Sequence, residues 1–137
     1  MMRRVVLLGV SVLALSGCSV GMSSTRHEGV PAQFIGTWNG EGTQVNPAGE
    51  WTIEAIVVGG PARQVGTISY PSLQCGGVLV LRSAGANWLE VGEDITRGDC
   101  EDGGVITFTP MADGRLRYAW RKEGIDMTAE GMLTRVR

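Results

Sequence analysis

The sequence predicts an all-β domain, an antiparallel up-and-down meander of about eight strands that closes into a barrel. From Phe34 onward, apolar and polar residues alternate in short runs, the pattern of strands with one buried face. Turn residues separate these runs, and no window shows a sustained helical period. Because short links favour pairing of sequential strands, and closure removes exposed edges, a barrel is favoured. A two-sheet sandwich is the alternative.

The alternating runs define the expected strands in chain order. They are Phe34–Gly42, Glu50–Val58, Arg63–Tyr70, Val78–Ser83, Trp88–Ile95, Val105–Thr109, Arg115–Arg121 and Met127–Arg135. Gly- or Pro-containing links join most of them, and Asp113-Gly114 between two alternating runs is a hairpin signal.

Alternation also indicates which side chains face the interior. Glu93 shares its parity with Leu89 and Val91, and Arg135 shares its parity with Leu133, so both charged residues are expected to point inward. An unpaired buried carboxylate costs several kcal/mol. We therefore hypothesise that Glu93 pairs with Arg135 or with the indole N–H of Trp38. The alternative is that Glu93 orients a ligand inside the barrel.

Aromatic residues are the other candidates for a binding site. The candidates are Trp51, Tyr70, Tyr118 and Trp120. These side chains could either line a pocket or fill the core. Trp88 has the opposite parity to its apolar neighbours and is expected to be exposed near one end of the barrel.

The N-terminus has the layout of a bacterial export signal. Arg3 and Arg4 precede an apolar run of about 11 residues, too short for the roughly 20 that span a bilayer. Leu15-Ser16-Gly17-Cys18 then resembles the lipobox, which implies cleavage before Cys18 and lipidation of that cysteine. The expected organisation is a removed signal over residues 1–17, a lipidated tether over 18–33 and one domain over 34–137. The protein is expected on the extracytoplasmic face of a bacterial cell membrane.

The expected lipidation of Cys18 and the expected extracytoplasmic location determine how the three cysteines are interpreted. With Cys18 assigned to lipid, Cys75 and Cys100 remain as a pair in an oxidising compartment, so a disulfide is expected. A metal pair or a catalytic thiol is disfavoured because the single histidine, His27, lies in the tether.

Composition excludes several functions. Loss of the two signal arginines leaves 10 Lys and Arg against 14 Asp and Glu, a mildly acidic balance that argues against nucleic acid as a partner. The acidic residues around Cys100 are interpreted as a solvated loop rather than a calcium site, since no calcium-loop pattern fits them. Nucleophile-elbow and phosphate-loop motifs are missing, so neither an enzyme nor a cofactor is expected.

Two resemblances add to this reading. Gly36-Thr37-Trp38 with the distant Arg135 resembles the calycin pattern of lipocalins and avidins, which implies that Trp38 packs across the barrel floor beside the arginine. A second resemblance covers nearly all of Phe34–Arg135 and rests on four segments in order, Gly36–Trp38, Val65–Gly77, Glu93–Cys100 and Tyr118–Trp120. With the matching cysteine pair, they are similar to a small β-domain found in secreted actinobacterial lipoproteins and on the extracellular side of some membrane serine/threonine kinases. That family implies a sensor or ligand-binding role. We therefore expect a module that binds a small molecule, with a protein-interaction or structural lipoprotein as the alternative.

Overall fold

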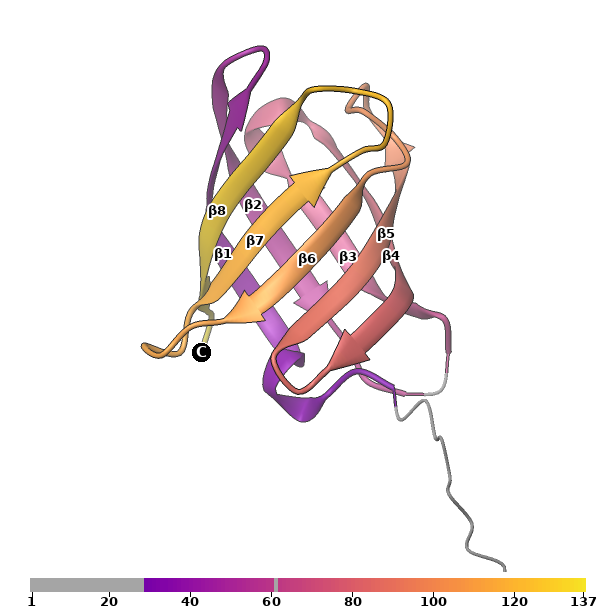
Figure 1. The fold of residues 1–137 in the computed structure, drawn as a ribbon, viewed down its shortest axis with the longest axis vertical. Coiled ribbons are helices and arrows are strands. Elements are labelled where there is room, and N and C mark those ends of the chain that lie inside the picture. Colours follow the sequence, from indigo (N-terminus) through magenta and orange to yellow (C-terminus); the bar gives the residue numbers. More distant parts are fainter. Residues whose placement is uncertain (1–28, 61) are drawn as a thin grey trace, which may run out of the picture.

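The computed structural model describes residues 29–60 and 62–137 (Figure 1). The expected signal peptide, Cys18 and the first part of the tether lie outside the described residues. Within the described residues, no helix combines the length and apolar character needed to cross a bilayer.

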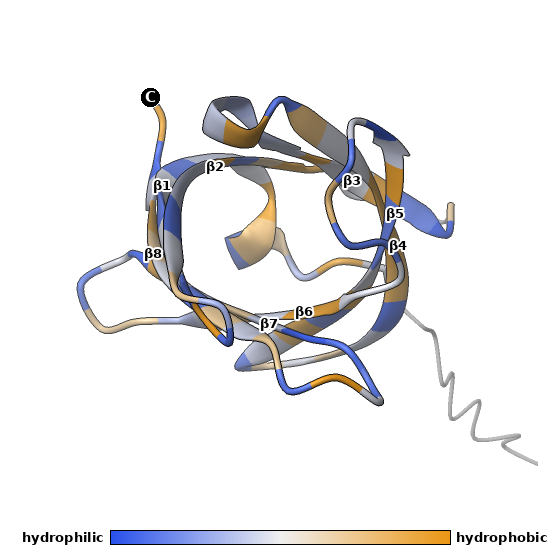
Figure 2. Ribbon diagram, turned by 90° about the horizontal axis from the view of Figure 1, so that it is seen from above, coloured by the Kyte–Doolittle hydropathy of each residue, from blue (hydrophilic) through white to orange (hydrophobic). Residues whose placement is uncertain are grey.

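Eight strands form one closed barrel in which each strand is antiparallel to the next and the last pairs with the first. They are β1 (Gly36–Val45), β2 (Gly49–Val57), β3 (Gln64–Tyr70), β4 (Cys75–Gly85), β5 (Trp88–Arg97), β6 (Val105–Pro110), β7 (Leu116–Arg121) and β8 (Thr128–Arg135). Figure 2 shows the barrel from above, with hydrophilic and hydrophobic residues alternating along the strands. The predicted barrel is confirmed, and the sandwich alternative is wrong.

One strand begins earlier than the sequence indicated. Cys75, Gly76 and Gly77 were assigned to a link, but they form the start of β4 and pair with the end of β3. A Cβ atom at Gly77 would lie 1.9 Å from the carbonyl oxygen of Asp94. The glycine is therefore required by the close approach of two backbones within the sheet, not by a turn.

The chain enters the barrel at one end and closes it there. A short 3-10 helix, η1 (Ala32–Phe34), precedes β1 below the lower end of the barrel in Figure 1, and Phe34 is fully buried. Val30 is also buried, so the folded domain begins before the predicted boundary at residue 34. Pro31, which has no N–H to lose at a helix start, caps η1.

Trp38 and Arg135 complete this closed end, which we call the floor. The indole N–H of Trp38 donates to the carbonyl oxygen of Phe34 at 2.9 Å, and the Arg135 guanidinium lies 4.2 Å from the centroid of the Trp38 ring. Arg135 also donates to the carbonyl oxygens of Gln33 and Ile35. The contact implied by the calycin resemblance is therefore present, and it ties the first strand to the last.

Candidate functional site

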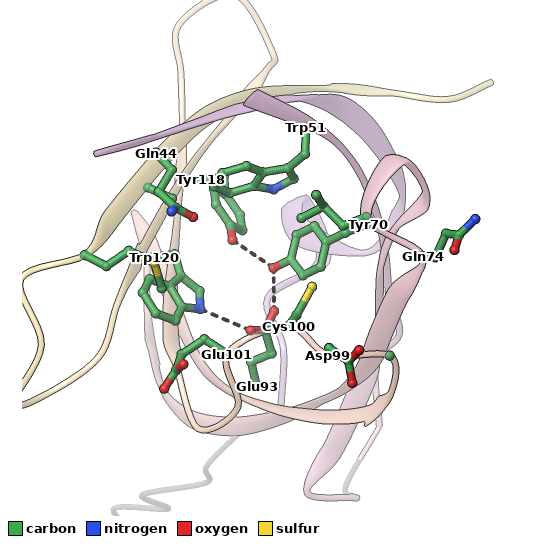
Figure 3. Close-up of a pocket in the computed structure, with 14 residues that line it drawn as sticks. Gln44, Trp51, Tyr70, Gln74, Glu93, Asp99, Cys100, Glu101, Tyr118 and Trp120 are labelled. Atoms are coloured by element: carbon green, nitrogen blue, oxygen red, sulfur yellow. Dashed lines mark hydrogen bonds between the residues drawn. The ribbon is translucent and has the colours of Figure 1, made fainter. Parts of the chain in front are cut away.

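The end of the barrel opposite the floor, which we call the mouth, opens into a cavity of about 570 Å³ (Figure 3). The β1–β2, β3–β4, β5–β6 and β7–β8 connections lie at this end. All four aromatic residues proposed from the sequence line the cavity, together with Glu93. Trp38 and Arg135 do not line it, because they lie at the floor.

A hydrogen-bonded cluster forms the deep wall of the cavity. Glu93 is only 2% exposed and accepts hydrogen bonds from the phenol of Tyr70 and, at 3.1 Å, from the indole N–H of Trp120. The phenol oxygens of Tyr70 and Tyr118 are 2.8 Å apart. Glu93 comes from β5, Tyr70 from β3, and Tyr118 and Trp120 from β7. The cluster therefore joins strands that are not neighbours in the sheet, and Figure 3 draws its hydrogen bonds as dashed lines.

Burial sets the protonation of these groups. It raises the pKa of both phenols, so that Tyr70 and Tyr118 stay protonated and able to donate. Burial also raises the pKa of Glu93, while the hydrogen bonds from Tyr70 and Trp120 oppose that rise by stabilising the carboxylate. The cluster thus contains one buried ionisable group, Glu93, whose carboxylate is positioned by the hydrogen bonds that Tyr70 and Trp120 donate to it.

The expected pairing of Glu93 with Arg135 or with the Trp38 indole is wrong. Parity correctly placed Glu93 on the inner face, but it gives no height along the barrel axis. Glu93 lies toward the mouth end of β5, and Arg135 is the last residue of β8, at the floor. The barrel interior between them is filled by apolar residues, among them Phe108 and Leu133.

The β5–β6 connection fixes the position of Glu93. The backbone N–H of Glu93 donates to Gly104 at 2.9 Å, and that of Gly103 donates back to the Glu93 carbonyl at 3.2 Å. Gly104 also makes room for an indole, since a Cβ atom there would lie 2.0 Å from the Trp120 ring nitrogen. Asp102 accepts hydrogen bonds from the N–H groups of Ile95 and Gly103. The loop thereby holds both Glu93 and its Trp120 donor in register.

A disulfide fastens the same loop to the barrel. Cys75 and Cys100 are bonded, with Cα atoms 6.0 Å apart and a sequence separation of 25, so the predicted pairing is confirmed. Cys100 itself lines the cavity, as do its neighbours Asp99 and Glu101. The disulfide therefore anchors the acidic rim of the mouth to the start of β4.

Trp51 lines the opposite part of the cavity. Its ring meets Tyr70 edge to face, with centroids 6.3 Å apart. Its buried indole nitrogen has no hydrogen-bond partner within the described residues. The two roles proposed for the aromatics are combined here, because Tyr70, Tyr118 and Trp120 are buried core residues that also face the cavity.

The other candidates lie elsewhere. Trp88 is 41% exposed, as expected from its parity, and lies at the floor end of β5. Glu101 pairs with Lys122 at 2.6 Å. Within residues 29–60 and 62–137, no cluster of three or more His, Cys, Asp or Glu side chains is arranged to hold a metal ion.

Sequence reasoning missed Gly104 and Asp102 as positioning residues, and it missed the contact between the two phenols. Gly104 falls in the link between the expected strands Trp88–Ile95 and Val105–Thr109, and no local pattern distinguishes a glycine that turns the chain from one that admits an indole. No protein-family model matches the chain, and no curated protein matches it in sequence. The function must therefore be inferred from the geometry of the mouth.

Proposed function

We propose that this chain is a lipid-anchored protein on the extracytoplasmic face of a bacterial membrane, and that its barrel binds a small molecule. The observation that carries the proposal is the cavity of about 570 Å³ at the mouth. Ligand sites typically measure roughly 300–1,000 Å³ and combine aromatic walls with a few placed polar groups. Here, four aromatic side chains surround one buried carboxylate.

The direction of chain entry supports the same picture. The described chain begins at Gly29 and reaches β1 through η1, at the floor. A tether from a lipidated Cys18 would therefore join the barrel at its closed end. The mouth is at the opposite end of the barrel from this entry (Figure 1), so the proposed anchor would leave it accessible to soluble ligands.

Binding is proposed in preference to catalysis. Both carboxylate oxygens of Glu93 already accept a hydrogen bond from the protein, and the domain sequence contains no histidine to act as a general base near neutral pH. The alternative, an interaction or structural lipoprotein, draws its support from the exposed Trp88 at the floor.

Native mass spectrometry of the chain recovered from its own envelope tests the proposal. We expect a population that carries a non-covalent small-molecule mass. Met127→Trp, at the mouth, should abolish that mass by filling the cavity. Met111→Trp is the matched control, because Met111 is exposed in the β6–β7 turn at the floor. Recovery of a bound protein instead, with no small molecule in either variant, would favour the alternative.

A further inference from the structure

The hydrogen atoms of the mouth cluster can be assigned one by one. Tyr70 has a single phenolic hydrogen, which it donates to Glu93. In the 2.8 Å contact between the phenols, the hydrogen must therefore come from Tyr118. The indole hydrogen of Trp120 also goes to Glu93. With Glu93 ionised, every polar side-chain hydrogen of the cluster is used internally, and only oxygen lone pairs remain available to a ligand.

The charges around the cavity have one predominant sign. Three carboxylates line it, those of Glu93, Asp99 and Glu101, and no Lys, Arg or His side chain does so within the described residues. Lys122 pairs with Glu101 at the rim and offsets one of these charges. A concave site with a net negative charge raises the local concentration of cations.

The walls suit a cation as well. Trp51, Tyr70, Tyr118 and Trp120 line the cavity. The face of an aromatic ring attracts a nearby cation, by about 2 kcal/mol or more when the site is desolvated. The same rings give apolar surface to the body of a ligand. The cavity therefore offers hydrogen-bond acceptors, negative charge and aromatic surface together.

We propose that the ligand is a small organic cation, an ammonium group with N–H donors attached to an apolar body. The ammonium group donates to Glu93, and the body lies against Trp51 and Trp120. This inference rests on the proposed binding function and names its ligand class. A carboxylate ligand would meet like charge, against which the lining side chains of the described residues offer only neutral donors, the unpaired indole N–H of Trp51 and the amides of Gln44 and Gln74. A neutral ligand would forgo the charge interaction.

Three probes of similar shape test the inference by isothermal titration calorimetry on the purified chain. They are phenethylamine, 2-phenylethanol and 3-phenylpropionate, which differ chiefly in charge. A hydrogen bond to a charged group contributes about 1.5–3 kcal/mol, and 1.4 kcal/mol is a factor of ten in affinity. We therefore expect the amine to bind at least about tenfold more tightly than the alcohol, and the acid to bind more weakly than both.

Matched variants locate the interaction. Glu93→Gln should weaken amine binding at least about tenfold, because the charge interaction with the ammonium group is lost. Glu90→Gln is the control, since Glu90 lies on the same strand but faces outward to Arg82 and Arg121. Glu101→Gln is a second test, which can be used even if Glu93→Gln does not fold. Glu101→Gln leaves the Lys122 charge at the rim without its carboxylate partner and should also weaken binding of the amine.

Several results would overturn the inference. They are equal binding of amine and alcohol, preference for the acid, an unchanged amine affinity in Glu93→Gln or in Glu101→Gln, and no binding of any probe. None of these results would contradict the proposed binding function if native mass spectrometry still detects a bound small molecule that is lost in Met127→Trp. If native mass spectrometry detects no bound small molecule, the binding function itself is rejected.

Discussion

Reduction of the Cys75–Cys100 disulfide should lower the free energy of unfolding by an amount that follows from its loop. The bond closes a loop of 25 residues. In the chain-entropy model, a loop of this length gives about 3.5 kcal/mol at 25 °C. Stabilities of small domains are about 5–15 kcal/mol, so this one bond would account for a large share of the total. Comparing oxidised with reduced chain changes only the Cys75 and Cys100 side chains and so isolates the effect of the bond.

Urea unfolding followed by tryptophan fluorescence measures the effect. The oxidised chain should unfold at a higher urea concentration than the chain in excess dithiothreitol. Cys75→Ala/Cys100→Ala is the matched control, because the reductant should leave its midpoint unchanged. A difference below about 1 kcal/mol between oxidised and reduced chain would refute the reasoning, since it would mean that the bond does not restrict the unfolded chain as the chain-entropy model requires.

Two further predictions concern Glu93 and Cys18. The folded protein holds the Glu93 proton more tightly than the unfolded chain does, so stability should fall as pH rises from the ordinary value of 4.5 through the raised pKa. The titratable groups facing Glu93 are Tyr70, Tyr118 and Asp102. In Glu93→Gln, the urea midpoint should fall less between pH 4 and pH 8 than it does in the unmodified chain. If the midpoints of the two chains fell in parallel over this range, the prediction would be contradicted. Cys18→Ala should abolish incorporation of alkyne-palmitate into the chain, whereas Cys75→Ala should not, and labelling that persists in Cys18→Ala would exclude that cysteine as the lipid site.

Alternation predicted the inner face correctly for the buried site residues but not their neighbours, and Arg135, which it also assigned to the interior, is exposed at the floor. A period of two assigned Glu93, Tyr118 and Trp120 to the interior, and all three are buried there. Height along the barrel depends instead on register, and the β4–β5 pairing shifts at two places, between Gly76 and Gly77 and between Leu81 and Ser83. Such bulges leave no periodic signal in a single sequence. Strand direction alone was nevertheless enough to separate Glu93 from Arg135, because β5 and β8 run in opposite directions in an up-and-down meander and each residue lies in the second half of its strand.

Contacts across the barrel were out of reach for a related reason. Tyr70 and Tyr118 lie on β3 and β7, which do not pair with each other. Only closure of the sheet brings their phenols together. The floor was predictable because a resemblance, rather than periodicity, linked Trp38 to Arg135. The cavity itself could not be foreseen, since its size depends on how far each inward side chain extends.

The pairing of β1 with β8 also has a consequence for how the protein is made. Until Thr128–Arg135 has emerged, β1 and β7 each keep one row of unpaired N–H and C=O groups. Open edges of this kind recruit strands from neighbouring chains, and pairing between distant segments is slow. A chain that emerges N-terminus first therefore passes through a stage in which the sheet is open and prone to aggregation at its edges, and this stage ends only when the final strand pairs. Truncation before Thr128 would make that stage permanent.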